Sequence, residues 1–240
     1  MEFSLFKSAA WQLVQQMDWV ALLILLGLFC VSVLCIAIIA FKYTIFKRHY
    51  MNLQQLLKRL RHVQSFNEVI TTTKEFRETL GGAFLSNNMQ SLRTVMQRYQ
   101  TSKVADAEHD QPGHVALSRD DINQLELMVN QNIDNMLLEE EAYLPVLNAS
   151  ASVAPLVGLF GTIWGLIHAF IDISQEKSAD IATVAPGMAE ALIVTLAGLV
   201  VAIPAMIAFF YFSNQLRKFE FNLSEIGDRF LMVVKQHFVK

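Results

Sequence analysis

This chain of 240 residues has few charged side chains and few cysteines. Charged residues make up 17% of it, against about 25% in ordinary soluble domains, while hydrophobic residues reach 53% and the mean hydropathy is positive. Both cysteines, Cys30 and Cys35, fall inside one apolar stretch and carry no metal or redox signature. The composition therefore places the chain among membrane proteins rather than soluble domains.

Sequence motifs for chemistry are also missing. The chain has no glycine-rich phosphate loop, no His/Cys spacing for a metal site and no internal repeat. The formal net charge of −3 argues against nucleic acid as a partner. The sequence thus predicts no catalytic residues, no cofactor and no metal ion, and we do not expect an enzyme.

What the chain does have is three long runs without any Asp, Glu, Lys or Arg. They are residues 19–41, 142–171 and 191–216, with lengths of 23, 30 and 26 residues. Since about 20 apolar residues cross the hydrocarbon core of a bilayer, each run is long enough to span it. The first run exceeds the apolar core of a signal peptide and is followed by basic residues, so we interpret it as a retained anchor.

The distribution of charge predicts the topology of these spans. Residues 42–61 contain six Lys or Arg and no acid, whereas residues 172–190 contain four acids and one lysine. By the positive-inside rule, the N-terminus and the segment 172–190 lie outside the cytoplasm. The predicted order is an amphipathic lead-in (1–18), the first span (19–41), a cytoplasmic helical domain (42–141), the second span (142–171), a short outer loop (172–190), the third span (191–216) and a cytoplasmic helical tail (217–240).

The cytoplasmic segments are predicted to be helical. Residues 50–100 indicate two or three helices interrupted at Gly81-Gly82, and the polar residues of 101–117 indicate a loop. A capping box at Ser118 and Asp121 then predicts a helix that runs on into the second span, with a bend near Pro145.

Apolar residues in the tail alternate steps of three and four, which is typical of a helix that packs against others. They are Leu216, Phe219, Leu223, Ile226, Phe230 and Val233. The predicted fold is therefore all-α, with three transmembrane helices, of which the second and third extend into a cytoplasmic helical bundle.

Small residues form one stripe along each of the last two spans, and each stripe contains one threonine. The stripes are Ala151, Pro155, Gly158, Thr162, Gly165 and Ala169 in the second span and Ala191, Thr195, Gly198, Ala202 and Ala205 in the third, and Gly161 is a further small residue. Because lipid is better matched by bulkier apolar side chains, these faces should meet protein or water. Close helix packing and the lining of a narrow polar pore both remain open, and hydroxyl groups at similar depth favour lining.

Ionisable residues at the edges of these spans are further candidates. Glu190 is either an interfacial cap in the first turn of the third span or a functional carboxylate, and His168 either anchors its helix at the headgroups or relays protons. A hydrolase that pairs Ser150 or Ser152 with His168 is disfavoured. The pair lies roughly 24 Å or more apart along one predicted helix, so it could react only between subunits.

Two continuous segments resemble the signature sequences of the TolQ/ExbB/MotA proton-channel family. The first is APLVGLFGTIWG at 154–165 followed by LIHAF, and the second is VAPGMAEALIVT at 184–195 followed by LAGLVVAIPA. The likeness covers about 60 residues, from 150 to 212, and the His-Ala-Phe after the first segment is closer to the TolQ branch.

The resemblance implies a ring-forming oligomer in the bacterial inner membrane. It implies a homopentamer with its N-terminus in the periplasm, around a pore that holds a TolR- or ExbD-like single-span partner; a TolA- or TonB-like protein is another expected partner. Proton flow is expected to drive rotation and to transmit force to the cell envelope. On this resemblance Thr162, Thr195 and Glu190 belong to the ion pathway. Outer-membrane integrity, nutrient import and motility all remain possible tasks, as do proton and sodium transport, and the alternative is a passive scaffold without ion flux.

Overall fold

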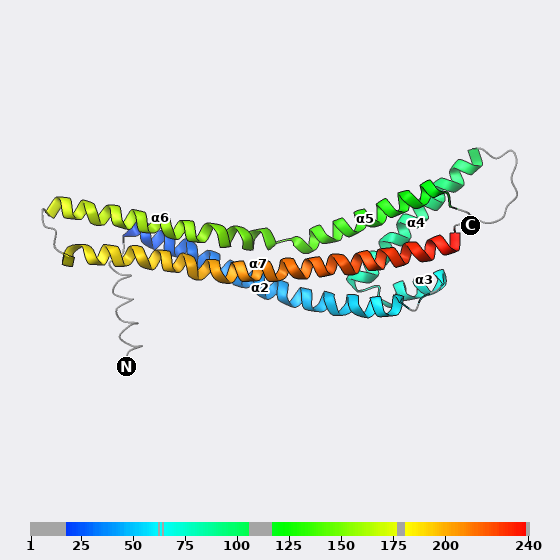
Figure 1. Ribbon diagram of the computed structural model, residues 1–240, viewed down its shortest axis with the longest axis horizontal. Helices are drawn as coiled ribbons and strands as arrows, with labels where there is room; N and C mark the ends of the chain where they lie inside the picture. The colour runs from blue at the N-terminus through cyan, green and yellow to red at the C-terminus, as the bar shows by residue number, and fades with distance from the viewer. Residues whose placement is uncertain (1–17, 62, 64, 106–116, 177–180, 239–240) are drawn as a thin grey trace. The chain divides into compact units, whose positions relative to one another are not determined.

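The computed structural model describes residues 18–61, 63, 65–105, 117–176 and 181–238 (Figure 1). Within these ranges all regular structure is helical. The six helices are α2 (Trp19–Leu60), α3 (Phe66–Glu75), α4 (Leu80–Ala105), α5 (Arg119–Glu141), α6 (Leu144–Glu176) and α7 (Ile181–Phe238). Residues 1–17 of the predicted lead-in (1–18) and 106–116 of the predicted loop (101–117) lie outside the described residues. Residues 101–105 of that loop belong instead to helix α4.

Three of these helices are long and apolar enough to cross a membrane, as the three charge-free runs predicted. They are α2, residues 144–171 of α6 and residues 184–238 of α7. The first helix continues without interruption from the apolar run through the basic segment to Leu60, and the third continues to Phe238.

The second span does not continue from the helix before it, so this prediction is wrong. Helix α5 ends at Glu141 and α6 begins at Leu144 (Figure 1). Between them Tyr143 adopts a φ of 71°, in the left-handed region that interrupts a right-handed helix. The interruption at Tyr143 lies two residues before Pro145, close to the predicted bend, and Pro145 itself occupies the first turn of α6, where its missing N–H needs no helical partner. The first and third spans, rather than the second and third, are the continuous ones.

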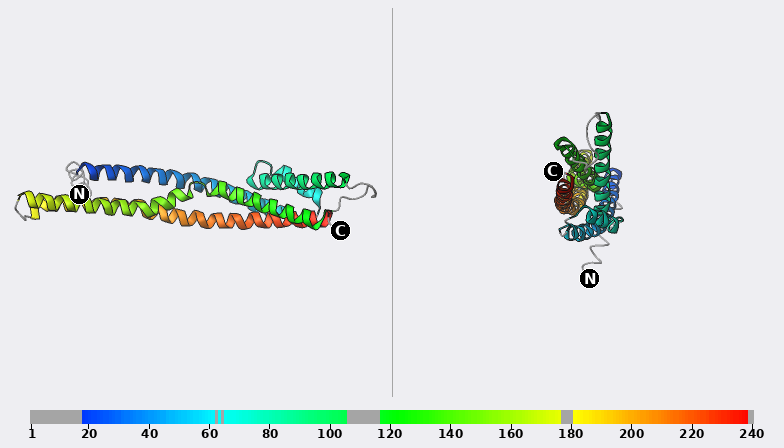
Figure 2. Two further views of the ribbon diagram at one scale, coloured as in Figure 1. Left: turned by 90° about the horizontal axis from the view of Figure 1, so that it is seen from above. Right: turned by 90° about the vertical axis from the view of Figure 1, so that its right-hand side faces the viewer.

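The chain divides into two compact units. Unit 1 comprises residues 1–42 and 143–212, and unit 2 comprises residues 43–142 and 213–240. In unit 1 the N-terminal part of α2 runs beside α6 and α7 (Figures 1 and 2). Its small core joins the three helices through Ala21, Ile24, Leu28, Ala154, Val194, Val201 and Ala202. Most large apolar side chains of this unit remain exposed, as expected for helices that face lipid.

Unit 2 is a helical bundle with its own apolar core. The core draws on all its helices and includes Leu56, Val69, Phe84, Leu125, Leu223 and Ile226. The predicted apolar spacing of the tail is confirmed, because Phe219, Phe230 and Val233 are also buried. The Asp121 carboxylate accepts a hydrogen bond from the Ser118 N–H at 3.0 Å, which is one half of the predicted capping box.

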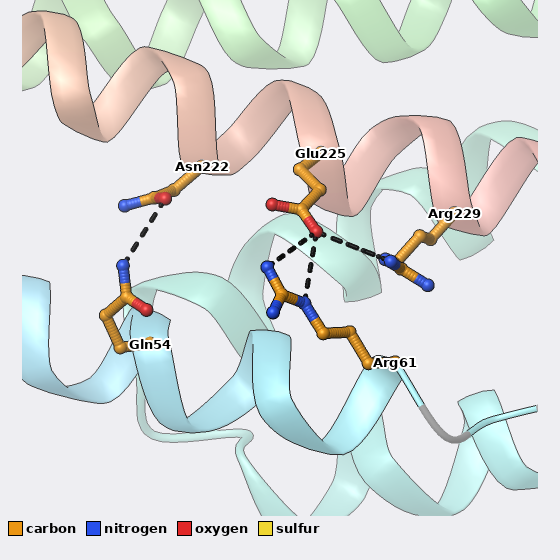
Figure 3. Close-up of polar contacts among 5 residues, drawn as sticks. All are labelled: Gln54, Arg61, Asn222, Glu225 and Arg229. Atoms are coloured by element: carbon orange, nitrogen blue, oxygen red, sulfur yellow. Dashed lines mark hydrogen bonds and ion pairs between the residues drawn. The ribbon is translucent and has the colours of Figure 1, made fainter.

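Polar contacts fix the register of α2 against α7 inside unit 2 (Figure 3). The Gln54 amide donates to the Asn222 side-chain oxygen at 3.5 Å. One turn further on, Glu225 Oε1 lies 3.3 Å from Arg61 Nη2 and 3.4 Å from Arg229 Nη2. One carboxylate oxygen therefore joins the guanidinium of Arg229 in α7 to that of Arg61, the residue directly after α2.

The break between α3 and α4 lies at residues 76–79 and not at the glycine pair, which instead occupies the first turn of α4. A Cβ atom on Gly82 would overlap the carbonyl oxygen of Phe76. The Gly82 N–H also donates a hydrogen bond to the Thr79 hydroxyl oxygen at 3.2 Å. Glycine is thus needed at position 82 because the turn at Phe76 approaches the start of α4 closely. The glycine pair therefore marks a helix boundary, but the break itself lies about three residues earlier than predicted.

Candidate membrane site

The two small-residue stripes meet within one chain, where α6 packs against α7. A Cβ atom added at Gly198 would lie 2.6 Å from the carbonyl oxygen of Ala154. One added at Gly158 would lie 3.0 Å from the Cα of Thr195. Since both neighbours are backbone atoms, the two helices approach each other as closely as their main chains allow. Side chains larger than hydrogen do not fit at these points without moving a helix.

The other small residues extend this contact along both helices. A Cβ atom at Gly165 would lie 2.9 Å from the Cβ of Ala191, and one at Gly161 would overlap the Val194 side chain. Ala202 is buried in the core of unit 1. Pro155 lies inside α6 and is partly buried.

Both threonine hydroxyls donate to backbone carbonyls. Thr195 Oγ1 donates across the helix contact to the carbonyl oxygen of Gly158 at 2.9 Å. Thr162 Oγ1 donates to the carbonyl oxygen of Leu159, three residues back in its own helix, at 2.7 Å. A hydroxyl group has one hydrogen and two lone pairs. With the hydrogen engaged in this way, each threonine oxygen retains only the capacity to accept a further hydrogen bond.

Glu190 does not lie in the first turn of its own helix, contrary to the expectation of an interfacial cap. Helix α7 begins at Ile181, nine residues earlier, and includes Pro186. Glu190 is therefore in the third turn and is partly buried. A carboxylate there gains little from the dipole of α7, because that effect fades beyond the first turn.

The Glu190 carboxylate instead meets the start of α2. The neighbour that acts on it electrostatically is Asp18, the residue directly before that helix. The Asp18 carbonyl accepts the first helical hydrogen bond, from the Leu22 N–H at 3.0 Å. Glu190 thus acts at the positive end of the α2 dipole, on a different helix from the one that carries it.

Asp18 also binds α6 through its side chain. The Trp164 indole N–H donates to Asp18 Oδ2 at 2.9 Å. The His168 ring lies 4.9 Å from the Trp164 ring, and His168 Nδ1 lies 3.2 Å from the Trp164 carbonyl oxygen. A proton on Nδ1 satisfies that carbonyl and leaves Nε2 as the free ring nitrogen. Asp18, Trp164, His168 and Glu190 therefore form one polar cluster that joins α2, α6 and α7.

The sequence reading missed Asp18 and assigned it to the lead-in. The available signal was an Asp immediately before a charge-free helical run, which is the favoured residue type and place for an N-cap. Its contacts with Trp164 and Glu190 join residues more than 140 positions apart, so local spacing could not reveal them.

The described residues do not support an intramolecular serine hydrolase. Ser150, Ser152 and His168 all lie on the continuous helix α6, so roughly 24 Å or more of helix axis separates either serine from the histidine. The Ser152 hydroxyl donates to the carbonyl oxygen of Asn148 at 3.0 Å. Within the described ranges, no three His, Cys, Asp or Glu side chains are grouped as metal ligands.

Comparison with known families shows to which protein family the chain belongs. The model of the MotA/TolQ/ExbB proton channel family matches residues 83–225, more than half of the chain. The chain belongs to this family. The matched residues include both stripes, both threonines and three of the four residues in the polar cluster, so the proton channel family shares the region described above.

Individual relatives carry two different names. The chain is 38% identical over 119 residues to the Tol-Pal system protein TolQ of Haemophilus influenzae, a match that covers 50% of each chain. It is 53% identical over 73 residues to TolQ of Pseudomonas aeruginosa, which covers 30% of this chain and 32% of that protein. It is 42% identical over 82 residues to the biopolymer transport protein ExbB of Salmonella typhimurium, covering 34% of each. The matches thus span half or less of the length of these relatives.

Proposed function

We propose that this protein is the ring subunit of a motor complex that is driven by the proton-motive force across the bacterial inner membrane. Five copies surround a TolR/ExbD-like single-span partner, with the N-terminus in the periplasm and the C-terminus in the cytoplasm. The complex transmits force to the cell envelope through a TolA/TonB-like protein. Membership of the MotA/TolQ/ExbB proton channel family and the three apolar helices support this proposal.

The observation that carries the proposal is the bonding of the two threonine hydroxyls. Their hydrogens are engaged by the carbonyls of Gly158 and Leu159, so their oxygens can accept from water or from a protonated carboxylic acid. They cannot donate to a carboxylate without first breaking those bonds. Thr162 and Thr195 therefore favour the protonated form of an acidic group on the partner as it passes the ring.

The driving force is electrostatic and is applied to the moving proton. A membrane potential supplies about 2.3 kcal/mol per elementary charge per 100 mV. In this scheme Glu190 receives the proton at the outer end of the pathway, and His168 relays it through its free Nε2. The glycine and alanine positions keep α6 and α7 close together, which leaves the pore wide enough for the partner.

A passive oligomeric scaffold without ion flux is the second candidate, and one observation favours it. The Thr195 hydroxyl donates to α6 and the glycines contact α7, which is what helix packing alone would require. The two candidate functions differ in one respect: whether the hydroxyl oxygens of Thr162 and Thr195 accept hydrogen bonds from a proton carrier on the partner.

The decisive experiment measures proton flux in the assembled complex. The full chain is produced together with a TolR/ExbD-like protein from the same genome, the complex is purified, and its subunits are counted by native mass spectrometry. Proton uptake into proteoliposomes is then followed with internal pyranine under a potassium diffusion potential. The variants are Thr162→Val/Thr195→Val, the matched Thr162→Ser/Thr195→Ser, and Thr94→Val as control. Thr94 also donates to a carbonyl four residues back but lies in unit 2.

We expect five copies of this chain around the partner, loss of flux in the double valine variant, and retention of most flux in the double serine variant and the Thr94→Val control. Serine preserves the hydroxyl while valine preserves the shape. Wild-type flux in the double valine variant would disprove the hydroxyl role. No flux in the wild-type complex, with the ring intact, would support the scaffold.

A further inference from the structure

Four large apolar side chains of unit 2 lie on its surface rather than in its core. They are Leu127 and Leu138 on α5 and Phe221 and Met232 on α7, and between 55% and 71% of each residue is exposed. On both helices the two residues lie eleven positions apart. Eleven residues make three helical turns and rise about 16 Å, so the two members of each pair share one face. Each helix therefore presents two apolar side chains at the same spacing.

Contacts inside unit 2 fix the level of α5 against α7. A Cβ atom on Gly227 would lie 2.9 Å from Val129 Cγ1. The Leu117 N–H, directly before the cap of α5, donates to the carbonyl oxygen of Phe238 at 2.9 Å. Residue numbers thus rise along α7 while they fall along α5, so the two helices are antiparallel (Figures 1 and 2). Every position of α5 can therefore be matched with the position of α7 at the same level.

The exposed apolar residues form two pairs with one common offset in level. Leu138 and Phe221 lie nine and six positions from the glycine contact, toward the N-terminal end of α7. Leu127 and Met232 lie two and five positions from it, toward the C-terminal end of α7. In both pairs the α7 residue is therefore three positions, or about 4.5 Å, nearer that C-terminal end.

The direction of helical side chains closes most of this offset. Each side chain leans toward the N-terminus of its own helix and covers the surface about one position away. Because α5 and α7 are antiparallel, the side chains of each pair lean toward each other's level. The lean removes about two positions, or about 3 Å, of the offset. The remainder is shorter than the reach of a phenylalanine or methionine side chain.

Charges at one end of the two faces are complementary. Arg217 lies one turn before Phe221 on α7, and Glu141 lies one turn after Leu138 on α5. Both charged side chains are exposed, and their offset in level is two positions, in the same sense as that of the apolar pairs. A contact between the two faces would therefore bring opposite charges together, whereas a contact between like faces would not.

We propose that the α7 face with Phe221 and Met232 packs against the α5 face with Leu138 and Leu127 of a second copy of this chain. Rotation about an axis along the bundle changes no position along that axis, so levels matched within one chain stay matched between adjacent copies. The contact joins two different faces and is heterologous, and its repetition closes a ring. This inference rests on the ring of the proposed function and adds which faces meet in it.

Cysteine pairs test which faces meet. Both native cysteines are first replaced by alanine. The matched variants are Phe221→Cys/Leu138→Cys and Met232→Cys/Leu127→Cys. The control Phe221→Cys/Leu127→Cys replaces the same residue types at levels eight positions, or about 12 Å, apart. A disulfide requires Cα atoms within about 7 Å, so the reaction discriminates between these levels.

Membranes that contain the full chain and a co-produced TolR/ExbD-like partner are oxidised with copper phenanthroline and resolved on non-reducing gels. We expect both matched variants to form a ladder of cross-linked species that ends at the size of the ring and disappears on reduction. The mismatched control and the four single-cysteine variants should remain monomers, since like faces do not meet in a heterologous contact.

Exchange of the charged pair supplies a second measurement. In the Phe221→Cys/Leu138→Cys background, Arg217→Glu should lower the initial rate of cross-linking about twofold to fivefold, and the addition of Glu141→Arg should restore it. The same charge variants in the chain without introduced cysteines are compared for the amount of intact ring by native mass spectrometry. Loss with Arg217→Glu that Glu141→Arg does not restore would contradict the pairing.

The outcomes separate this inference from the proposed function. A single-cysteine variant that dimerises as fast as the matched pairs would show that like faces meet and would refute the inference. Equal ladders in the mismatched control would refute it too, as would no cross-links in either matched variant while the ring remains intact; both leave the proposed function standing. Ladders in the matched variants without proton flux through the wild-type complex would support the inference and refute the motor. Absence of both ladder and ring would refute the two together.

Discussion

The closest backbone contact between α6 and α7 offers the sharpest test of packing in unit 1. In Gly198→Ala the new methyl group would lie 2.6 Å from the carbonyl oxygen of Ala154 and 3.3 Å from the Cα of Gly158. Ordinary contact would require the helices to separate by about 1 Å. Both neighbours are main-chain atoms within helices, so no side-chain rotation can relieve the overlap.

The expected destabilisation follows from two opposing effects. Overpacking of a tight contact costs about 1–3 kcal/mol, and the higher helix propensity of alanine returns up to about 1 kcal/mol. We therefore expect Gly198→Ala to lower the free energy of unfolding by about 1–2 kcal/mol. Gly27→Ala is the matched control, because nothing lies within 4 Å of a Cβ atom there. That variant should be neutral or slightly stabilised.

Unfolding is followed by circular dichroism as dodecyl sulfate is titrated into detergent micelles that contain the purified protein. Two intermediate variants extend the series. Gly158→Ala, with its nearest atom at 3.0 Å, should lose less stability than Gly198→Ala, and Gly187→Ala, at 3.5 Å, should resemble Gly27→Ala. Equal midpoints for Gly198→Ala and Gly27→Ala would show that the two helices do not meet as described.

Unit 2 allows two further predictions. Gly82→Ala should lower its free energy of unfolding by about 2–3 kcal/mol, because the new Cβ would overlap the Phe76 carbonyl. Gly81→Ala should cost less, because its new Cβ meets only side-chain atoms, those of Leu56 and Leu53, and the same titration compares the two variants. Glu225→Gln should cost only about 0.2–1 kcal/mol, since the Arg61 side chain is 57% exposed. The difference between Glu225→Gln and wild type should shrink at 0.5 M NaCl, and an effect that is larger and independent of salt would contradict this estimate.

Local patterns in the sequence predicted the local features well. The charge-free runs predicted the three apolar helices, and steps of three and four predicted the buried face of the tail. The bond between Asp121 and Ser118 was also predictable, because its two partners are three residues apart. In each case the signal lies within a few turns of one helix, where spacing alone fixes which side chains share a face.

The features that the sequence did not predict depend on contacts between distant segments or on rare backbone conformations. Tyr143 interrupts the chain with a positive φ, although no glycine or asparagine marks the position. The Gly81-Gly82 pair suggested a break, but its glycines serve the close approach of the Phe76 turn. The position of Glu190 suggested a cap for its own helix, whereas Glu190 lies in the third turn of α7 and its electrostatic neighbour is Asp18, directly before α2. That partner is separated from it by most of the chain.

Helix packing and the proposed ion chemistry are compatible uses of the same threonine. Packing between α6 and α7 needs the hydrogen of the Thr195 hydroxyl, which donates to Gly158, and acceptance from a proton carrier needs only the lone pairs. Engaging the hydrogen also fixes the direction of the lone pairs, which a freely rotating hydroxyl would not do. In the proposed function, the packing bond thus orders an acceptor before any proton arrives, and such preorganised dipoles need no reorientation when charge passes. A glycine at position 158 is part of the same arrangement, because only a bare backbone lets its carbonyl come within 2.9 Å of that hydroxyl.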